Sequence, residues 1–241
     1  MVDVLSLGPL LIRLSWLYLG ISALAAFWVM KAVLKRKSPE DLQIVDVLSN
    51  GLIWGILIWK VSPAFTDPSL LANPFTLIVY PGTALGVRLG MLAALLYTVY
   101  SVWKRSIDWK ITLDTLTIGW IAASIVFLLS HWQYGTATAL PWGISISDPA
   151  FRYHPVNVYK LILLAALAWS LRRLVVGQGK VAQHGLVGYG VVSLFVSLFE
   201  PKAAVLLELS KAQLIAVITV IAGFAVGIAM RYLNSPKRQS L

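Results

Sequence analysis

Six basic or imidazole side chains lie inside or beside long apolar stretches of this sequence, where such groups are rare. They are Arg13, Lys60, Arg88, His131, Arg152 and His154. A charge at the centre of a bilayer costs about 2.5–3.5 kcal/mol or more, so the position of each of these side chains calls for a structural or functional explanation. The simpler interpretation is that long side chains extend to the interface. The functional interpretation is that Lys60, Arg88 and Arg152 form a pocket for an anionic lipid headgroup.

Two of these residues could also take part in catalysis. An imidazole takes up and releases a proton near neutral pH, so His131 is a candidate base. Arg88 lies six residues after Gly82, well inside its apolar stretch, and could supply a fixed positive charge. The simpler interpretation of His131 is a hydrogen-bonded or solvated interfacial residue. The chain has no cysteine, which excludes a thiol nucleophile and thiolate metal ligands.

The elements that carry these residues must be membrane helices. The chain has 241 residues, of which 59% are hydrophobic and only 12% charged, and its mean hydropathy is +0.79. Lipid offers no partner for open backbone groups, so a spanning segment of about 20 residues must be helical. We predict an all-α, polytopic integral membrane protein with one domain, residues 1–241. Its seven expected spans are about 10–31, 44–64, 82–103, 111–131, 156–171, 183–200 and 212–230.

Lysine and arginine gather in every second connection between these segments. They are Lys31, Lys35, Arg36 and Lys37 after the first, Lys104, Arg105 and Lys110 after the third, Arg172, Arg173 and Lys180 after the fifth, and Arg231, Lys237 and Arg238 at the end. The positive-inside rule predicts that these connections are cytoplasmic, the N-terminus outside and the C-terminus inside. Topology therefore explains the net charge of +10 better than nucleic acid would.

The longest connection expected outside, residues 132–155, is still fairly apolar and rich in proline. Irregular backbone at membrane depth is tolerated only against protein or a wet cavity. A part-embedded segment, either a re-entrant turn or a surface-lying cap, would make this connection a candidate wall of a site. A plain connector with aromatic anchors is the alternative.

Motifs in order along the chain resemble bacterial prolipoprotein diacylglyceryl transferase. The run Leu140–Ile144 contains that family's Pro-Trp-Gly element, and Arg152–Tyr159 resembles its outer-face His-Pro element. The matching residues are Tyr134, Gly135, Pro141, Trp142, Gly143, His154, Pro155 and Tyr159. The resemblance implies transfer of diacylglyceryl from phosphatidylglycerol to the lipobox cysteine of preprolipoproteins. It places the reaction at the outer leaflet of the bacterial plasma membrane, without metal, soluble cofactor or nucleic acid.

The sequence departs from the family at its polar clusters. The stretch Gly86–Gly90 has no histidine where the family has His-Gly-Gly. The stretch Leu128–Gly135 lacks the arginine, asparagines and glutamate of the Arg-x-Gly-Asn element. Ser193 and Ser197 stand where the family has arginine and glutamate, and Lys160 replaces another glutamate. Since no local cation replaces these arginines at their own positions, we expect little standard transferase activity.

Three functions stay open at this point. The first is a divergent diacylglyceryl transferase with a relocated site, in which His131 and Arg88 act. The second is a non-catalytic family member that binds phospholipid or lipoprotein precursors. The third is an unrelated membrane transporter or assembly subunit. The order of the family-like motifs along the chain argues against this third function.

Overall fold

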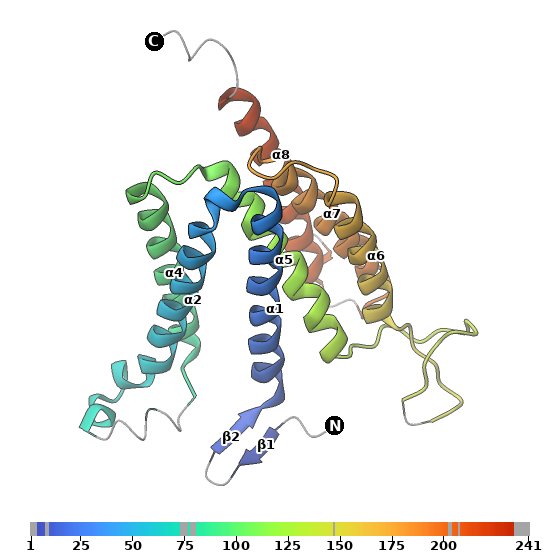
Figure 1. Ribbon diagram of the computed structural model, residues 1–241. Coiled ribbons are helices and arrows are strands. Elements are labelled where there is room, and N and C mark those ends of the chain that lie inside the picture. Colours follow the sequence, from blue (N-terminus) through green and yellow to red (C-terminus); the bar gives the residue numbers. More distant parts are fainter. Residues whose placement is uncertain are drawn as a thin grey trace.

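The computed structural model describes residues 4–7, 10–72, 77, 81–146, 148–201, 204–206 and 208–233, and within them long helices dominate (Figure 1). These helices are α1 (Leu14–Lys37), α2 (Gln43–Val61), α4 (Ala84–Lys104), α5 (Trp109–Ser130), α6 (Val156–Leu171), α7 (Lys180–Ser197) and α8 (Lys211–Leu233). Each one coincides with an apolar segment that we expected to be helical. The prediction of a helical membrane protein is confirmed.

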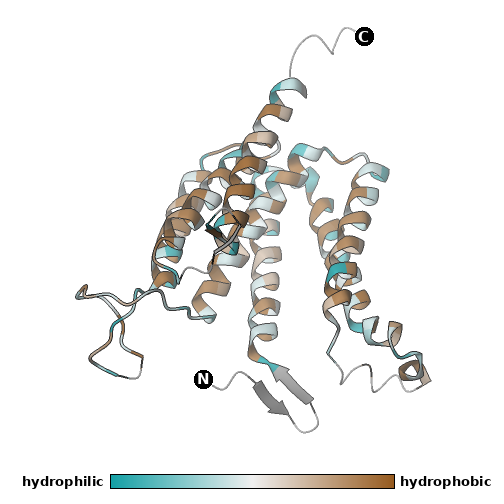
Figure 2. Ribbon diagram, turned by 180° about the vertical axis from the view of Figure 1, so that it is seen from behind, coloured by the Kyte–Doolittle hydropathy of each residue, from teal (hydrophilic) through white to brown (hydrophobic). Residues whose placement is uncertain are grey.

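Five stretches of the described chain are long and apolar enough to cross a membrane. They are α1, the stretch Pro39–Phe65 that contains α2, α4, α5, and α8 up to Tyr232. Helix α6 is apolar but shorter, with 16 residues. Hydrophobic residues predominate along the helices (Figure 2), and many of their side chains face outward; Trp28 is 74% exposed and Met91 is 69% exposed. The chain is therefore a multi-pass membrane protein.

The first helix begins later than the sequence indicates. We expected a span from residue 10, but Leu10–Arg13 form strand β2, which pairs antiparallel with β1 (Val4–Leu7). Helix α1 then starts at Leu14. Apolar residues suit a strand as well as a helix, and here Leu10–Arg13 pair with Val4–Leu7 instead of continuing α1. A second small pair, β3 (Ala204–Leu206) with β4 (Leu209–Ser210), precedes α8.

The helices pack in neighbouring pairs. Helix α2 lies along α4, α1 along α5, and α7 along α8, with α6 beside α5 and α7 (Figure 1). The α2–α4 pair stands to one side and approaches closely through glycine. A Cβ atom added at Gly55 would lie 2.9 Å from the Gly90 carbonyl oxygen, so any larger residue would force the two helices apart.

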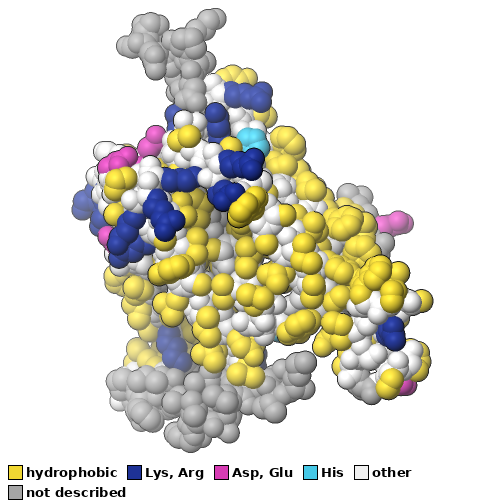
Figure 3. Space-filling view, turned by 45° about the vertical axis from the view of Figure 1, so that its right-hand side comes forward, with side chains coloured by type: hydrophobic (Ala, Val, Ile, Leu, Met, Phe, Trp, Pro, Cys, Tyr) yellow, Lys and Arg dark blue, Asp and Glu magenta, His cyan; other side chains and the backbone are white. Residues whose placement is uncertain are grey.

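One end of the bundle is both tightly packed and positively charged, and we call it the basic end. Here α1, α4 and α6 finish, and Lys37, Arg105 and Arg172 lie in or beside the connections to the next helices. Figure 3 shows Lys and Arg side chains gathered at this end. The buried core lies close by and includes Leu34, Ile44, Val47, Val102 and Ile111. Lys237 and Arg238 lie outside the described residues.

Asp114 of α5 organises the basic end. It is fully buried, at 0% exposure. Its carboxylate accepts hydrogen bonds from the backbone N–H groups of Gly177 (2.9 Å), Gly179 (3.0 Å) and Ala182 (2.7 Å). These groups belong to the α6–α7 connection and to the first turn of α7, whose N–H groups have no partner within the helix. Asp114 therefore caps α7 from a neighbouring helix.

Candidate functional site

A large cavity of about 810 Å³ opens in the half of the bundle away from the basic end. It lies among α1, α2 and α5 and reaches α6 and α7. Its walls are mainly apolar and aromatic. Trp16 of α1 stacks on Trp59 of α2, with 4.5 Å between ring centroids. The polar side chains on its lining are Ser22, Ser124, His131, Gln133 and Lys160. This mixture is typical of a site for an amphipathic ligand.

A second cavity of about 350 Å³, which we call the side cavity, lies between α5, α6, α7 and α8. Trp120, Lys160 and Tyr189 line both cavities and form the partition between them. Tyr189 is central to this partition. Its ring lies 5.8 Å from that of Trp120 and 5.4 Å from the Lys160 ammonium. The side cavity adds three polar groups of its own, Ser193, Glu200 and Thr219. The Thr219 hydroxyl is already bonded to the Ile215 carbonyl oxygen.

Lys160 carries a positive charge without an anionic partner. The ring of Tyr189 is its one interaction within the described chain, where no hydrogen bond or ion pair reaches its ammonium. Lys160 is also the fifth residue of α6, near the helix end that favours anions. A charged group within a membrane segment that faces a cavity marks a ligand path far more often than a structural need.

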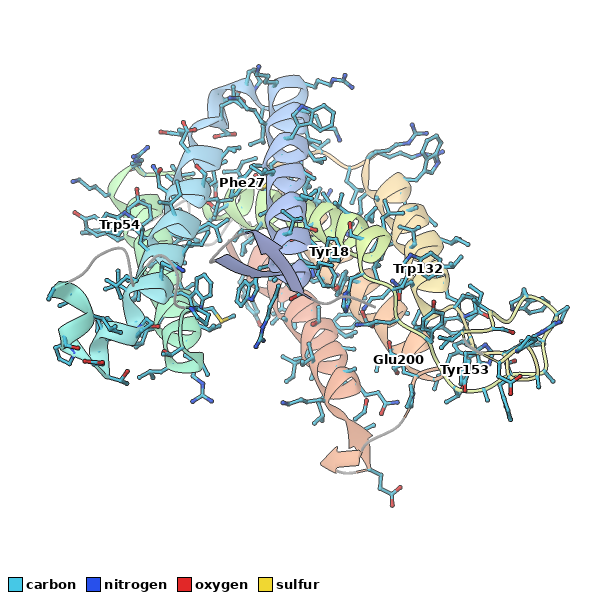
Figure 4. The ribbon with its side chains drawn as sticks, turned by 90° about the horizontal axis from the view of Figure 1, so that it is seen from below. Tyr18, Phe27, Trp54, Trp132, Tyr153 and Glu200 are labelled. Carbon is cyan, nitrogen blue, oxygen red and sulfur yellow. The ribbon has the colours of Figure 1, made fainter. Side chains whose placement is uncertain are left out.

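Two further polar groups beside Lys160 lack partners. The Ser193 hydroxyl is buried and makes no hydrogen bond with any described residue. In a helix such a hydroxyl ordinarily donates to a carbonyl one turn earlier. The Glu200 carboxylate forms no ion pair within the described residues. Glu200 (labelled in Figure 4) follows the C-terminal end of α7, the end away from the basic α6–α7 connection. The side cavity therefore offers a cation, a hydroxyl donor and a carboxylate, all free to bind a ligand.

His131 ends α5 and lines the large cavity together with Lys160. Its ring lies 5.1 Å from Phe127, and its backbone oxygen accepts a hydrogen bond from the Asn157 amide. Asn157 is buried and also donates to the Leu128 oxygen (2.9 Å) and accepts from the Gln133 N–H (2.7 Å). This one side chain therefore holds the end of α5 against the start of α6 and positions His131.

Three family-motif residues, Trp142, His154 and Tyr159, contact one another where the 132–155 segment meets α6. Trp142 Nε1 donates to the Tyr159 hydroxyl (2.8 Å), which lies 3.2 Å from His154 Nδ1. The Phe199 ring packs 4.9 Å from the His154 ring. A Cβ atom at Gly135 would collide with the Phe199 carbonyl oxygen, so only glycine fits at this position.

The rest of the 132–155 segment is an arm that extends from the bundle, with Trp132 and Tyr153 on it (Figure 4). Backbone bonds between Ile144 and Tyr153, both 3.0 Å, hold the arm together. Gly143 and Pro141 lie at its turn, where Arg152 donates to the Pro141 oxygen (3.3 Å). Pro155 precedes α6 and caps it, and Tyr134 is half-buried. Of this segment, Gln133 alone lines the large cavity.

The structure does not gather the three residues that we expected to hold a headgroup. Arg88 is exposed on α4, and Arg152 is exposed on the arm. Lys60 is half-buried, with its ammonium 5.9 Å from the Trp59 ring. None of the three lines either cavity described above. Of the two candidate catalytic residues, His131 lines the large cavity and Arg88 does not.

The sequence analysis did not single out most of the residues that line the large cavity or the side cavity. Lys160 stands out in the sequence only as a replaced glutamate, and Tyr189, Trp16 and Trp59 have no assigned role. The signal was available for Lys160, because a lysine within an apolar helix is as unusual as Arg88. For the aromatic residues no such signal exists, since tryptophan and tyrosine are common in membrane helices.

The fold defines a polytopic helical membrane protein, and its cavities have linings that mix apolar and polar side chains. The sequence profile of the prolipoprotein diacylglyceryl transferase family matches residues 3–229. The chain belongs to this family.

Relatives of the chain carry the name phosphatidylglycerol–prolipoprotein diacylglyceryl transferase. The protein from Pseudoalteromonas atlantica is 26% identical over 92% of this chain and 86% of its own length. The protein from Corynebacterium diphtheriae is 21% identical over 76% of this chain and 75% of its own length. The protein from Chlamydia caviae is 30% identical, over 43% of this chain and 40% of its own length.

Proposed function

We propose that the protein is a divergent diacylglyceryl transferase-like membrane protein whose two joined cavities take phosphatidylglycerol. The observation that carries the proposal is Lys160, a cation without an anionic partner on the wall of both cavities. A phospholipid phosphate would accept from the Lys160 ammonium and from the Ser193 hydroxyl. The hydroxyls of a glycerol headgroup would donate to Glu200. The aromatic and aliphatic walls of the large cavity suit the acyl chains.

The proposal places these cavities in the outer half of the bacterial plasma membrane. All seven helices cross the membrane, with the N-terminus outside and the C-terminus in the cytoplasm. The single membrane domain, residues 1–241, then turns its basic end to the cytoplasm, as the positive-inside rule requires. The 132–155 arm lies at the outer surface, where its aromatic residues suit a part-embedded position at the headgroup level.

The charge arrangement differs from that implied by the family motifs. Those motifs place a cation at position 193 and a carboxylate at position 160, whereas this chain has Ser193 and Lys160. Both positions line the side cavity. We propose that the cation has moved from α7 to α6, so that the site keeps one positive charge for a phosphate group.

Catalysis makes a stronger demand than binding. The thiolate of a lipobox cysteine would attack a glyceryl carbon, forming the S–C bond while the C–O bond to the phosphate breaks. The thiolate is the nucleophile, and the departing phosphate needs fixed positive charge. Lys160 supplies one cation, and His131 is a candidate base. We expect firm phospholipid binding and little standard transfer. The alternative is a non-catalytic protein that binds lipoprotein precursors without transfer. Family membership favours either of these two functions over an unrelated transporter or assembly subunit.

The test of binding is retention of phosphatidylglycerol by the purified full chain in native mass spectrometry. Lys160→Met should weaken retention roughly 5- to 10-fold, as expected for one headgroup cation, and Lys160→Arg should restore it. Lys211→Met is the matched control, since Lys211 is exposed and outside both cavities. Equal retention by wild type and Lys160→Met would contradict the proposal.

The test of catalysis is transfer of labelled diacylglyceryl from phosphatidylglycerol to a lipobox peptide. Little or no turnover is the expected result. Robust turnover that is lost in both His131→Ala and Arg88→Ala would show instead that the catalytic site has been rebuilt around those two residues. Complementation of a strain depleted of its own transferase gives the same answer in cells.

A further inference from the structure

A third cavity lies near the basic end and shares no lining residue with the two cavities already described. Its volume is about 330 Å³, and it runs between α1, α5, α6 and α7. Apart from Lys37 and Arg172, its lining is aliphatic, with Val33, Ile121 and Ala168 among the wall residues. We call it the inner cavity. Its volume falls at the lower end of the range for ligand pockets, about 300–1,000 Å³.

The mouth of the inner cavity is a basic depression. That depression is lined by Val33, Arg36, Lys37, Arg172 and Arg173. Val33, Lys37 and Arg172 belong to both linings, so the two spaces continue into one another. Among the described residues, neither lining contains a carboxylate. Four cations thus surround the entrance to an aliphatic cavity.

Two of the four cations are held in place by the protein. Lys37 Nζ donates to the backbone oxygens of Arg172 and Leu174, both at 2.7 Å, and so ties the end of α1 to the end of α6. The guanidinium of Arg172 stacks 3.1 Å from the centroid of the Trp169 ring. Stacked guanidinium groups keep their N–H donors free for a phosphate.

The other two cations are free to bind a ligand. Within the described chain, the guanidinium groups of Arg36 and Arg173 make no hydrogen bond or ion pair. Both are exposed at the basic end, where Figure 3 shows several Lys and Arg side chains close together. Gathering like charges is unfavourable unless an anion comes between them.

We infer that this pocket binds an anionic phospholipid of the inner leaflet. Its phosphate lies among Arg36, Lys37, Arg172 and Arg173, and one acyl chain enters the inner cavity. Topology alone requires basic residues in these connections. It does not require them to surround an aliphatic cavity without a carboxylate. Basic pockets between membrane helices on the cytoplasmic side are typical headgroup sites. The inference rests on the membrane orientation proposed above. It does not rest on the outer cavities, with which this pocket shares no lining residue.

The test measures binding of phosphatidylglycerol and phosphatidylcholine to the purified full chain in native mass spectrometry. All variants carry Lys160→Met, so that the outer cavities contribute little. Arg36→Gln with Arg173→Gln should lower the affinity for the anionic lipid roughly 10- to 30-fold and leave phosphatidylcholine unchanged. The matched control is Lys31→Gln with Lys35→Gln, which removes the same charge from exposed positions of α1 outside the pocket. An equal loss in the control would overturn the inference.

A second variant tests the acyl chain without changing charge. Ala122→Leu fills part of the inner cavity, because Ala122 lies on its wall, and should weaken the anionic lipid severalfold while the melting temperature stays within a few degrees. Unchanged lipid binding in a folded Ala122→Leu protein would show surface attraction alone and would contradict the site. Soluble glycerol phosphate should not displace the lipid; displacement would indicate a free phosphate site instead.

Discussion

The Asp114 carboxylate of α5 accepts a hydrogen bond of 2.7 Å from the backbone N–H of Ala182 in the first turn of α7. Together with its bonds to Gly177 and Gly179, this contact joins two helices that are distant in sequence. From the sequence, Asp114 lies one turn after Lys110, and that spacing predicts no more than a local ion pair. The structure gives Asp114 a tertiary role that no local pattern reveals.

Asp114→Ala should destabilise the protein strongly. It leaves three backbone N–H groups without an acceptor, and the loss should be on the order of 3 kcal/mol, since each buried orphan costs about 1–3 kcal/mol. The measurement is the midpoint of thermal unfolding in detergent. Asp46→Asn, at an exposed position of α2, should leave the midpoint unchanged. Equal unfolding midpoints for Asp114→Ala and wild type would show that the Asp114 cap of α7 does not stabilise the fold.

Gly90→Ala should weaken the α2–α4 pair. The added methyl group would collide with the backbone of Gly55, and overpacking of this kind costs about 1–3 kcal/mol. Gly20→Ala is the control, because nothing lies within 4 Å of a Cβ atom there. Disulfide crosslinking between engineered cysteines on α2 and α4 should slow in Gly90→Ala alone. Similar crosslinking rates in both variants would mean that the glycine contact is dispensable.

Tyr159→Phe should loosen the 132–155 arm. It removes the hydroxyl that accepts from Trp142 and contacts His154. Since Trp142 is 58% exposed, the loss should be modest, about 1 kcal/mol, and visible as severalfold faster proteolysis of the arm. Tyr18→Phe, on α1, serves as the control and should leave the cleavage rate unchanged. An arm that is equally resistant in Tyr159→Phe would show that other contacts hold it.

Membrane orientation is open to a direct test. A reporter that is active only in the cytoplasm should be active when fused after Arg173, within the basic connection between α6 and α7. The same reporter should be silent when fused after Pro149, on the arm. The reverse pattern would invert the predicted topology, and with it the assignment of the two ends of the bundle to the two leaflets.

Most helices were predictable because five of the apolar stretches are long enough to cross a membrane, and a segment that crosses a membrane must be helical. Their ends were harder to predict. Leu10–Arg13 is as apolar as the helix that follows, and only pairing with Val4–Leu7 shows that it is a strand. Hydropathy measures transfer into lipid and carries no information about such local pairing.

The sequence predicts a site of basic residues, but it does not show which residues line the cavities. Cost arguments from the sequence correctly mark basic residues within apolar segments as unusual. They do not say which side of a helix faces a cavity, and so they favoured Arg88, which is exposed on α4. Lys160 faces both cavities because α6 packs between α5 and α7, and that packing is a property of the whole bundle.

The lining of the large cavity has a consequence for biosynthesis. Its walls extend along the chain from Trp16 to Tyr189. A nascent chain emerges N-terminus first, so the translocon must release almost every helix before this space can close. Any truncated product that stops before α7 therefore lacks the partition formed by Tyr189. In such fragments Lys160 would lack the Tyr189 ring, its one interaction within the described chain.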